Sequence, residues 1–213
     1  MADLFISYSR EDSDIARRLQ AKLTEEQRDV WIDWEDLPAT AEWWEKIRDS
    51  ILTSDNFLII ISPNSIASPI CHLEIACAIE LHKRTVPIKY RDTDETEAFA
   101  TLISQPLNDF QRALLQGRNL LAVARDNWQV LAGLNWIDFT DDPSFQEKSQ
   151  ELLNAVDTDA EYVDEHTRLL VQATDWDNRK RNPDRLLRED ELMATEAWLK
   201  AIGDRVPPLD DSP

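Results

Sequence analysis

Glycine is scarce in this chain of 213 residues, and its scarcity argues against two common nucleotide-binding folds. The three glycines, Gly117, Gly133 and Gly203, are isolated from one another. Neither a G-x-G-x-x-G turn nor a GxxxxGKS/T loop can be built from them, although Rossmann and P-loop proteins need these sequences to hold phosphates. A Rossmann dehydrogenase and a P-loop NTPase are therefore disfavoured.

Cysteine is almost absent as well. Cys71 and Cys77 are six positions apart on one expected helix, so they point about 120° away from each other and a disulfide between them is implausible. His72 and Cys77 also diverge, and no pair of cysteines has the short spacing of a zinc site. We therefore expect no metal, and a reducing, cytoplasmic environment fits best.

Basic residues are outnumbered. The chain has 23 Lys and Arg against 42 Asp and Glu, which gives a formal charge of −19, so we expect neither nucleic acid nor an anionic membrane as a partner. No run reaches the roughly 18 apolar residues of a membrane helix. The sequence begins at once with the strand-like segment Asp3–Tyr8, so we expect no signal peptide.

Strand-like and helical segments alternate along the first two thirds of the chain. Such alternation predicts an α/β fold with a doubly wound, five-stranded parallel sheet, in which ligands bind at the carboxyl ends of the strands. The expected strands are Leu4–Ser7, Val30–Asp33, Phe57–Ile61, Val86–Lys89 and Trp136–Phe139. The expected helices are Ser13–Thr24, Trp43–Ser54, Pro69–Lys83 and Ser144–Val156.

Two regions depart from this rhythm. Residues 91–133 are long for a connection and carry helical spacing over Thr96–Ile103 and Asp109–Leu131, so they predict a helical insertion. After a domain of residues 1–156, residues 157–203 predict a helical hairpin extension, and residues 204–213 resemble a linker.

Glu74 occupies an unexpected position in the helix that follows the third strand. Ser68 and Pro69 predict the N-cap and the first helical residue. At about 100° per residue, Glu74 then lies on the same face as Cys77 and Leu81, inside the apolar stripe. A carboxylate there is paired, neutralised or used in chemistry, and pairing with an arginine at the rim of the stripe is the structural alternative.

Polar residues follow three of the predicted strands directly. They are Tyr8-Ser9-Arg10, Asp33-Trp34-Glu35 and Ser62–Ser68. Because the carboxyl ends of parallel strands meet at one edge of the sheet, we expect these segments to share that edge. For Ser9 the alternative is a helix cap, and for Arg10 a solvated surface charge.

Four segments, in order and at sensible spacing, resemble those of a TIR (Toll/interleukin-1 receptor) domain. They are residues 5–12 (FISYSRED), 31–38 (WIDWEDLP), 61–75 (ISPNSIASPICHLEI) and 134–139 (LNWIDF). The resemblance implies a flavodoxin-like fold for residues 1–156. The third segment contains the pattern S-x-x-C-x-x-E, formed here by Ser68, Cys71 and Glu74.

The resemblance also implies an activity. Many bacterial and plant TIR domains cleave NAD⁺ between nicotinamide and ribose, often in defence against phage, and their catalytic glutamate occupies the position of Glu74. NAD⁺ is then a substrate, and no cofactor is needed. The residues we expect around the substrate are Tyr8, Ser9, Arg10, Asp33, Trp34, Ser68, Ile70 and Cys71.

Two positions depart from the family pattern. Ile70 stands where bacterial NAD⁺-cleaving members often have tryptophan, and Ala39 follows Pro38 where glycine is common. Trp34, Trp43 and Trp44 are candidates for the missing aromatic surface. The loop Glu35–Glu42 corresponds to the one through which related enzymes self-associate, so we expect activity to depend on assembly.

Two other functions remain open from the sequence. Many TIR domains are adaptors that self-associate without catalysis, and nucleoside N-glycosidases or deoxyribosyltransferases share the fold and also use a glutamate. The extension, residues 161–201, resembles the segment that joins some bacterial TIR domains to WD40-type repeats, so a downstream repeat or sensor domain is an expected partner. We expect the extension to be dispensable for the chemistry.

Overall fold

A computed structural model describes residues 2–34 and 40–202 of the chain. The contacts divide the chain into two compact units, Met1–Val171 and Gln172–Pro213. In the predicted self-association loop, residues 35–39 lie outside the described residues. The structure describes the end of this loop from Thr40 onward. The Thr40 hydroxyl caps the following helix by accepting a hydrogen bond from the Trp43 backbone N–H at 3.3 Å.

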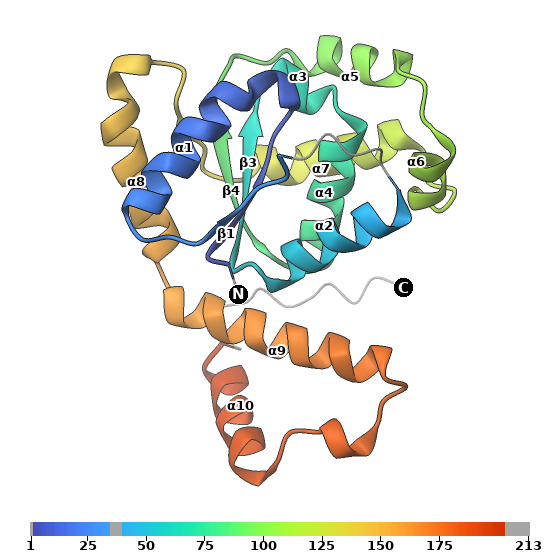
Figure 1. The fold of residues 1–213 in the computed structure, drawn as a ribbon, viewed down its shortest axis with the longest axis vertical. Coiled ribbons are helices and arrows are strands. Elements are labelled where there is room, and N and C mark those ends of the chain that lie inside the picture. The colour runs from blue at the N-terminus through green and yellow to red at the C-terminus, as the bar shows by residue number, and fades with distance from the viewer. Residues whose placement is uncertain (1, 35–39, 203–213) are drawn as a thin grey trace. The chain divides into compact units, whose positions relative to one another are not determined.

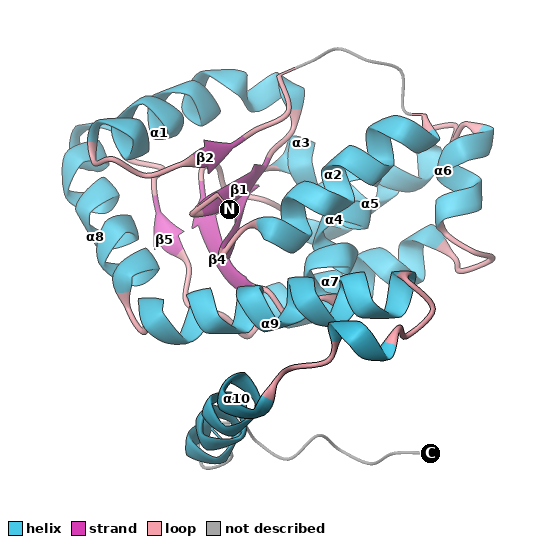
Figure 2. Cartoon of the chain, turned by 60° about the horizontal axis from the view of Figure 1, so that its bottom comes forward, coloured by secondary structure: helices cyan, strands magenta, loops and turns pink. Residues whose placement is uncertain are grey.

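The first unit contains the five-stranded, all-parallel sheet that the alternation predicted, so the fold class is confirmed. The strand order is β2-β1-β3-β4-β5, in which the chain reverses its winding direction between β1 and β3 (Figures 1 and 2). Ligands of such sheets bind where this reversal opens a crevice at the carboxyl edge. The strands are β1 (Leu4–Ser7), β2 (Val30–Trp31), β3 (Asn56–Ile61), β4 (Arg84–Lys89) and β5 (Ile137–Asp138).

Helices cover both faces of the sheet (Figure 1). Side chains alternate along each strand, so Leu4 and Ile6 pack with α1 and α8 on one face, whereas Phe5 packs with α2 and α4 on the other. Ser7 continues the face of Phe5 and therefore points toward α4. The covering helices are α1 (Ser13–Glu25), α2 (Ala41–Thr53), α4 (Pro69–Glu80) and α8 (Phe145–Asp157).

The predicted insertion is helical and covers the outer side of α4. Leu73 and Ala76 of α4 pack with Leu102, Leu115 and further residues of the insertion in a separate apolar cluster. The expectation of a single apolar stripe on α4 is therefore wrong, because even His72 on its far side is fully buried. The insertion helices are α5 (Glu95–Ser104), α6 (Asp109–Leu114) and α7 (Leu120–Ala132).

Local backbone chemistry corrects several predicted boundaries. Asp109–Leu131 is two helices rather than one, because Gln116 and Gly117 adopt positive φ angles of 51° and 83° between them. The helix predicted over Pro69–Lys83 ends at Glu80, and His82 follows with φ 51°. The predicted second and fifth strands are each shortened to the two residues that pair with β1 and β4.

The segment expected as an exit loop after β3 contains a short helix, α3 (Pro63–Ile66). Its N-terminus is a capping box in which the side chains of Ser62 and Ser65 each accept a hydrogen bond from the backbone N–H of the other. Ser9 precedes the one-turn η1 (Arg10–Asp12), but its side chain makes no capping hydrogen bond, so the capping alternative for Ser9 is wrong.

Beyond α8 the chain forms the helices expected of the extension. They are α9 (Ala160–Asn178) and α10 (Glu189–Ile202), preceded by the single turn η3 (Pro183–Arg185). Val163 and Thr167 of α9 are buried. Within the second unit, Asp175 pairs with Arg179 and Arg185 at 2.7 and 2.8 Å.

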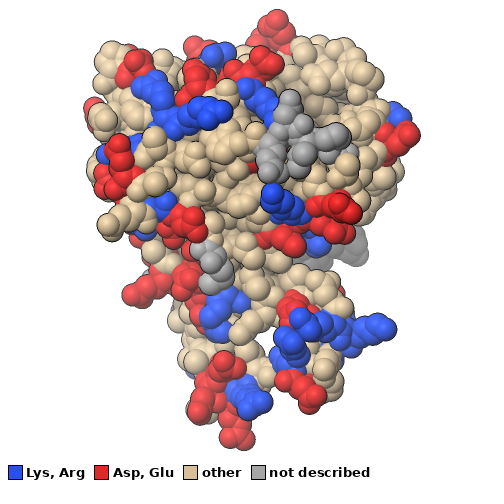
Figure 3. Space-filling model, in the orientation of Figure 1, with Lys and Arg blue, Asp and Glu red and all other residues tan. Residues whose placement is uncertain are grey.

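Charged side chains are mixed on the face shown in Figure 3, where red and blue groups lie interspersed over the first unit. None of the described helices is long and apolar enough to cross a membrane.

Candidate active site at the carboxyl edge of the sheet

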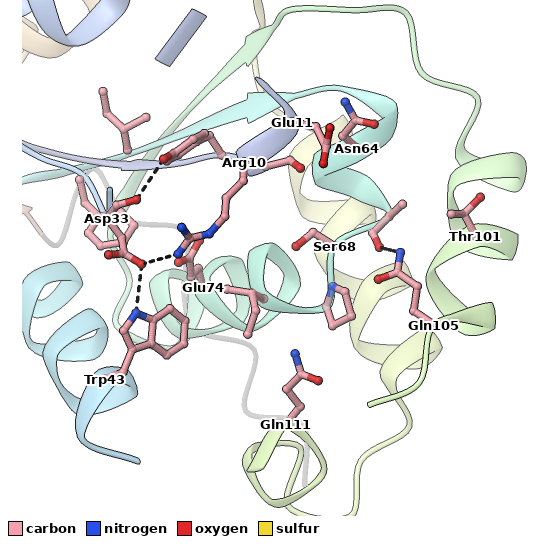
Figure 4. A pocket seen from close by; sticks show the side chains of 17 residues that line it. Arg10, Glu11, Asp33, Trp43, Asn64, Ser68, Glu74, Thr101, Gln105 and Gln111 are labelled. Atoms are coloured by element: carbon pink, nitrogen blue, oxygen red, sulfur yellow. Dashed lines mark hydrogen bonds and ion pairs between the residues drawn. The ribbon is translucent and has the colours of Figure 1, made fainter. Parts of the chain in front are cut away.

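A cavity of about 500 Å³ lies at the carboxyl edge, beside the point where the winding direction reverses (Figure 4). Its volume is in the range of small-molecule sites, roughly 300–1,000 Å³. The sheet, the η1 turn and α4 form one part of its wall, and the insertion forms another. The residues that line it are Phe5, Ile6, Tyr8, Ser9, Arg10, Glu11, Asp33, Trp43, Asn64, Ala67, Ser68, Pro69, Ile70, Glu74, Thr101, Gln105 and Gln111.

The start of α4 positions Glu74 in this wall. Ser68 is the N-cap, and its hydroxyl accepts a hydrogen bond from the Cys71 backbone N–H at 3.3 Å. Pro69 begins the helix, which places Glu74 in its second turn, beside the end of β1. There the Ser7 hydroxyl donates a hydrogen bond of 2.5 Å to Glu74 Oε2.

The environment of Glu74 favours its neutral form. Only 6% of the residue is exposed. Burial, with a smaller contribution from the Asp33 carboxylate, raises the pKa of Glu74 from its ordinary 4.5 to about 8, against the opposing effects of the Ser7 hydroxyl and Arg10. Glu74 has no ion pair among the described residues, so the arginine-paired alternative from the sequence is wrong. A cationic ligand in the cavity would favour the carboxylate.

Asp33 organises the part of the cavity wall that Arg10 and Trp43 share, on the same side as Glu74 (Figure 4). Its carboxylate accepts a hydrogen bond of 3.0 Å from Trp43 Nε1, and it lies 3.4 Å from the Arg10 guanidinium. The Tyr8 hydroxyl donates to the Asp33 backbone carbonyl at 3.0 Å. Burial raises the pKa of Tyr8 to about 12, so this phenol stays protonated as a donor.

A buried carboxylate also braces the η1 turn. Asp12 is completely buried, and its two oxygens accept hydrogen bonds from the Ser62 hydroxyl at 2.5 Å and the Asn64 amide at 3.0 Å. Arg91 lies 3.5 Å from the same carboxylate. This network ties the turn that carries Ser9 and Arg10 to the start of α3, so both parts of the wall are fixed together.

Most residues predicted for the substrate site lie around one cavity, but two do not. Tyr8, Ser9, Arg10, Asp33, Ser68 and Ile70 line it together with Glu74. Trp34 instead packs under Arg17 at 4.4 Å and donates from Nε1 to Gln20 at 3.2 Å, both on α1. Cys71 is buried in the core, where burial raises the pKa of its thiol to about 12 and leaves it unreactive.

Several cavity residues were not among the predicted site residues. Ser7 does not line the cavity but bonds Glu74, and it could have been found, since the alternation of β1 puts it on the face of Phe5, toward α4. Trp43 was considered only as one of three possible aromatic surfaces. Thr101, Gln105 and Gln111 come from the insertion, and no sequence pattern indicates where the insertion folds back. The described residues contain no group of three His, Cys, Asp or Glu side chains arranged to hold a metal ion.

The comparisons with known proteins identify the family. The TIR domain family matches the chain over residues 4–117, more than half of its length. The TIR domains of the activated Roq1 resistosome, which directly recognizes the pathogen effector XopQ, have a TM-score of 0.56 at 20% sequence identity, over 73% of this chain and 99% of that one.

The TIR domain of the Toll-related receptor TRR-2 from Hydra magnipapillata has a TM-score of 0.49 at 18% identity, over 73% and 98% of the two chains. The comparison with curated proteins gave no match. Because the family match over residues 4–117 covers more than half of the chain, the chain belongs to the TIR domain family.

Proposed function

We propose that this TIR domain cleaves the bond between nicotinamide and ribose in NAD⁺, with Glu74 as the catalytic carboxylate. The observation that carries the proposal is the buried Glu74 carboxyl group in the wall of a cavity large enough for a nucleotide. The TIR family includes NAD⁺ hydrolases, which makes this reaction the first to test. Perturbed carboxyl groups in a cavity are common at catalytic sites.

The reaction asks for one carboxylate and no general acid. When the bond between ribose C1′ and the ring nitrogen breaks, its electron pair goes to the ring, and the cationic nicotinamide leaves as a neutral molecule. The ribose then carries an oxocarbenium-like positive charge, which an adjacent carboxylate stabilises. Water adds to C1′ and loses a proton to complete hydrolysis. Glu74 supplies the carboxylate in this scheme.

The charge state of Glu74 is coupled to the substrate. In the free protein its pKa of about 8 leaves the group mostly protonated at neutral pH. The positive ring of NAD⁺ favours the carboxylate, so substrate binding lowers this pKa and releases a proton. Arg10, whose guanidinium lies beside Glu74 in Figure 4, binds the diphosphate in this proposal, while Tyr8, Ser9 and Asp33 orient the ribose hydroxyls.

We further propose that the active form is an assembly. The Roq1 TIR domains occur in a resistosome, and self-association through the loop Glu35–Glu42 follows from the family resemblance. A formal charge of −19 opposes assembly by self-repulsion, so salt should promote it by screening. The proposal includes a bacterial antiphage role and a WD40-type repeat or another sensor domain after the extension. Leu192, Met193 and Leu199 are exposed apolar side chains available for such a contact.

A non-catalytic scaffold is the second candidate function, and Ile70 is the observation that favours it. In this chain an aliphatic side chain lines the cavity where NAD⁺-cleaving relatives often have tryptophan. Trp43 lines the same cavity from α2 and offers an aromatic ring in compensation. A scaffold would assemble and release no nicotinamide.

The test is nicotinamide release from NAD⁺, measured by chromatography over a range of protein and salt concentrations. The wild-type chain should release nicotinamide, with a specific activity that rises with protein concentration. Glu74→Gln should be inactive. Glu80→Gln is the matched control, because Glu80 is exposed on the same helix and pairs with Arg118 at the surface. Assembly without nicotinamide release would establish the scaffold instead, and release of free base from nucleosides would indicate an N-glycosidase.

A further inference from the structure

The insertion contributes two glutamines to the cavity, and each is fixed by a partner that determines which end of its amide is occupied. Gln105 follows α5, and Gln111 lies in the first turn of α6. Figure 4 shows both side chains on the insertion side of the cavity, away from Asp33 and Trp43. Their orientation follows from the chemistry of their partners rather than from a choice between oxygen and nitrogen.

Gln111 presents a hydrogen-bond donor. Its Oε1 accepts the Asn108 backbone N–H at 3.0 Å, and its own backbone N–H donates to Asn108 Oδ1 at 2.7 Å, which completes a capping box. A backbone N–H can only donate, so Oε1 must face it. Nε2, which has no hydrogen-bond partner among the described residues, is left with both of its hydrogens.

Gln105 presents a hydrogen-bond acceptor. Its Nε2 donates to the backbone carbonyl of Ala67 at 2.9 Å, in the connection between α3 and α4. A carbonyl can only accept, so Nε2 must face it. Oε1 remains, also without a partner among residues 2–34 and 40–202. The same contact fixes the end of α5 to the segment that leads into the Glu74 helix.

We infer that Gln105 and Gln111 recognise the primary carboxamide of the substrate. A carboxamide has one carbonyl, which accepts from Gln111 Nε2, and one NH₂, which donates to Gln105 Oε1. The inference rests on the proposed cleavage of NAD⁺ and explains how the substrate is selected. The insertion binds the nicotinamide leaving group, while Glu74 acts at the ribose. The assignment gives residues 91–133 a function that their sequence did not reveal.

The arrangement predicts discrimination between closely related dinucleotides. Nicotinic acid adenine dinucleotide has a carboxylate in place of the carboxamide, and one of its oxygens would face Gln105 Oε1 with no hydrogen between them. 3-Acetylpyridine adenine dinucleotide keeps the carbonyl but has a methyl group in place of NH₂. It therefore keeps the contact with Gln111 and loses the contact with Gln105.

The test compares kcat/KM for NAD⁺ and the acetylpyridine analogue in two variants. Gln111→Glu keeps an oxygen for the capping box and removes the donor, so both substrates should lose about tenfold. Gln105→Met removes the acceptor with little change in size, so NAD⁺ should lose about tenfold and the analogue should be unchanged. Gln129→Glu, at an exposed position on α7, makes the same change of charge outside the cavity and should behave as wild type.

The quantity compared is the ratio of kcat/KM for NAD⁺ to kcat/KM for the analogue, in each variant relative to wild type. This comparison removes the intrinsic difference in reactivity between the two substrates. A ratio that falls about tenfold in Gln105→Met and stays constant in Gln111→Glu supports the inference. The wild-type ratio in both variants would overturn it.

A binding measurement separates this inference from the proposed function. In the Glu74→Gln protein, labelled with ¹⁵N, the side-chain NH₂ resonances of Gln105 and Gln111 are followed while nicotinamide or nicotinic acid is added. Shifts with nicotinamide and none with nicotinic acid support the inference, even if the wild-type chain cleaves no dinucleotide and the proposed function fails. No shift at either glutamine with nicotinamide would overturn it, even if NAD⁺ is cleaved.

Discussion

Each edge of the sheet has a buried ionisable side chain whose pKa moves to about 8, and the two pKa values reach it from opposite directions. At the carboxyl edge, burial raises the pKa of Glu74 from 4.5. At the amino edge, burial lowers the pKa of Lys83 from 10.5, and the nearby Asp55 carboxylate opposes the change. Each group is only 6% exposed, and removal from water disfavours the charged form of the acid and of the base alike.

What distinguishes the two groups is the space in front of them. Glu74 faces a cavity of about 500 Å³. Lys83 is covered by the first half of α9, where its Nζ donates to the Thr167 hydroxyl at 3.1 Å. The neighbouring Arg84 guanidinium donates to Asn56 Oδ1 and to backbone carbonyls at the end of α8. A shifted pKa therefore marks burial, and only access to a cavity turns burial into a candidate for catalysis.

The largest expected effect separates the two edges by activity. Glu74→Gln should lower kcat/KM for NAD⁺ by at least about 100-fold, roughly 2.7 kcal/mol of transition-state stabilisation, because the neutral amide cannot stabilise the ribosyl cation. Lys83→Met should leave kcat/KM within about twofold, since Lys83 lies far from the cavity along the sheet. Steady-state kinetics of folded, purified variants measure both. A similar loss in the two variants would remove the distinction between the edges.

The next effect concerns the cover over Lys83. A chain that ends at Val171 keeps Val163 and Thr167, which are buried, whereas a chain that ends at Asp159 loses both. The free energy of unfolding of the shorter chain should be about 2 kcal/mol lower, because one buried apolar side chain and one hydrogen bond are lost. Urea unfolding measures the difference. If the two chains are equally stable and both release nicotinamide, the domain ends before α9, in agreement with the boundary at residue 156 that the sequence predicts.

The pH dependence of stability is the smallest effect per pH unit, and in it the two groups act with opposite signs. Between pH 4.5 and 8 the folded state holds a proton on Glu74 that the unfolded state has lost, so its stability falls as pH rises. Between pH 8 and 10.5 the folded state loses the Lys83 proton first, so its stability rises. Each limb has a slope of at most about 1.4 kcal/mol per pH unit.

Two variants test which group causes the falling part and which the rising part of the dependence of stability on pH. Glu74→Gln should remove the falling limb alone, and Lys83→Met the rising limb alone. Urea unfolding at a series of pH values measures both slopes. Limbs that persist in the matching variant would mean that other groups control this pH range.

The sequence predicted the sheet and the position of Glu74 because both depend on short-range patterns. The apolar run Phe57–Ile61 and the Ser68-Pro69 helix start are local signals. The prediction of the site failed where it depends on the direction of a side chain or on contacts between residues far apart in the chain. Trp34 follows Asp33 in extended chain and therefore points away from the cavity, toward α1, although both residues follow the same strand.

The insertion shows the other limit of prediction from sequence. Its helical spacing was legible, but its packing over α4 depends on contacts between residues far apart in the chain. Gln105 and Gln111 are unremarkable in the sequence, since glutamine near a helix start or end has many uses. Only the cavity that they share with Glu74, and the partners that fix their amides, give them a role.

The pH dependence of kcat/KM for NAD⁺ tests the central claim most directly, because kcat/KM reports the ionisation of the free protein. The account predicts a rise of about tenfold per pH unit that levels off near pH 8, as the Glu74 carboxyl loses its proton. The kcat profile should level off at lower pH, because the cationic ring stabilises the carboxylate in the complex. A kcat/KM that is constant from pH 6 to 9 would mean that the reacting group is not the buried Glu74.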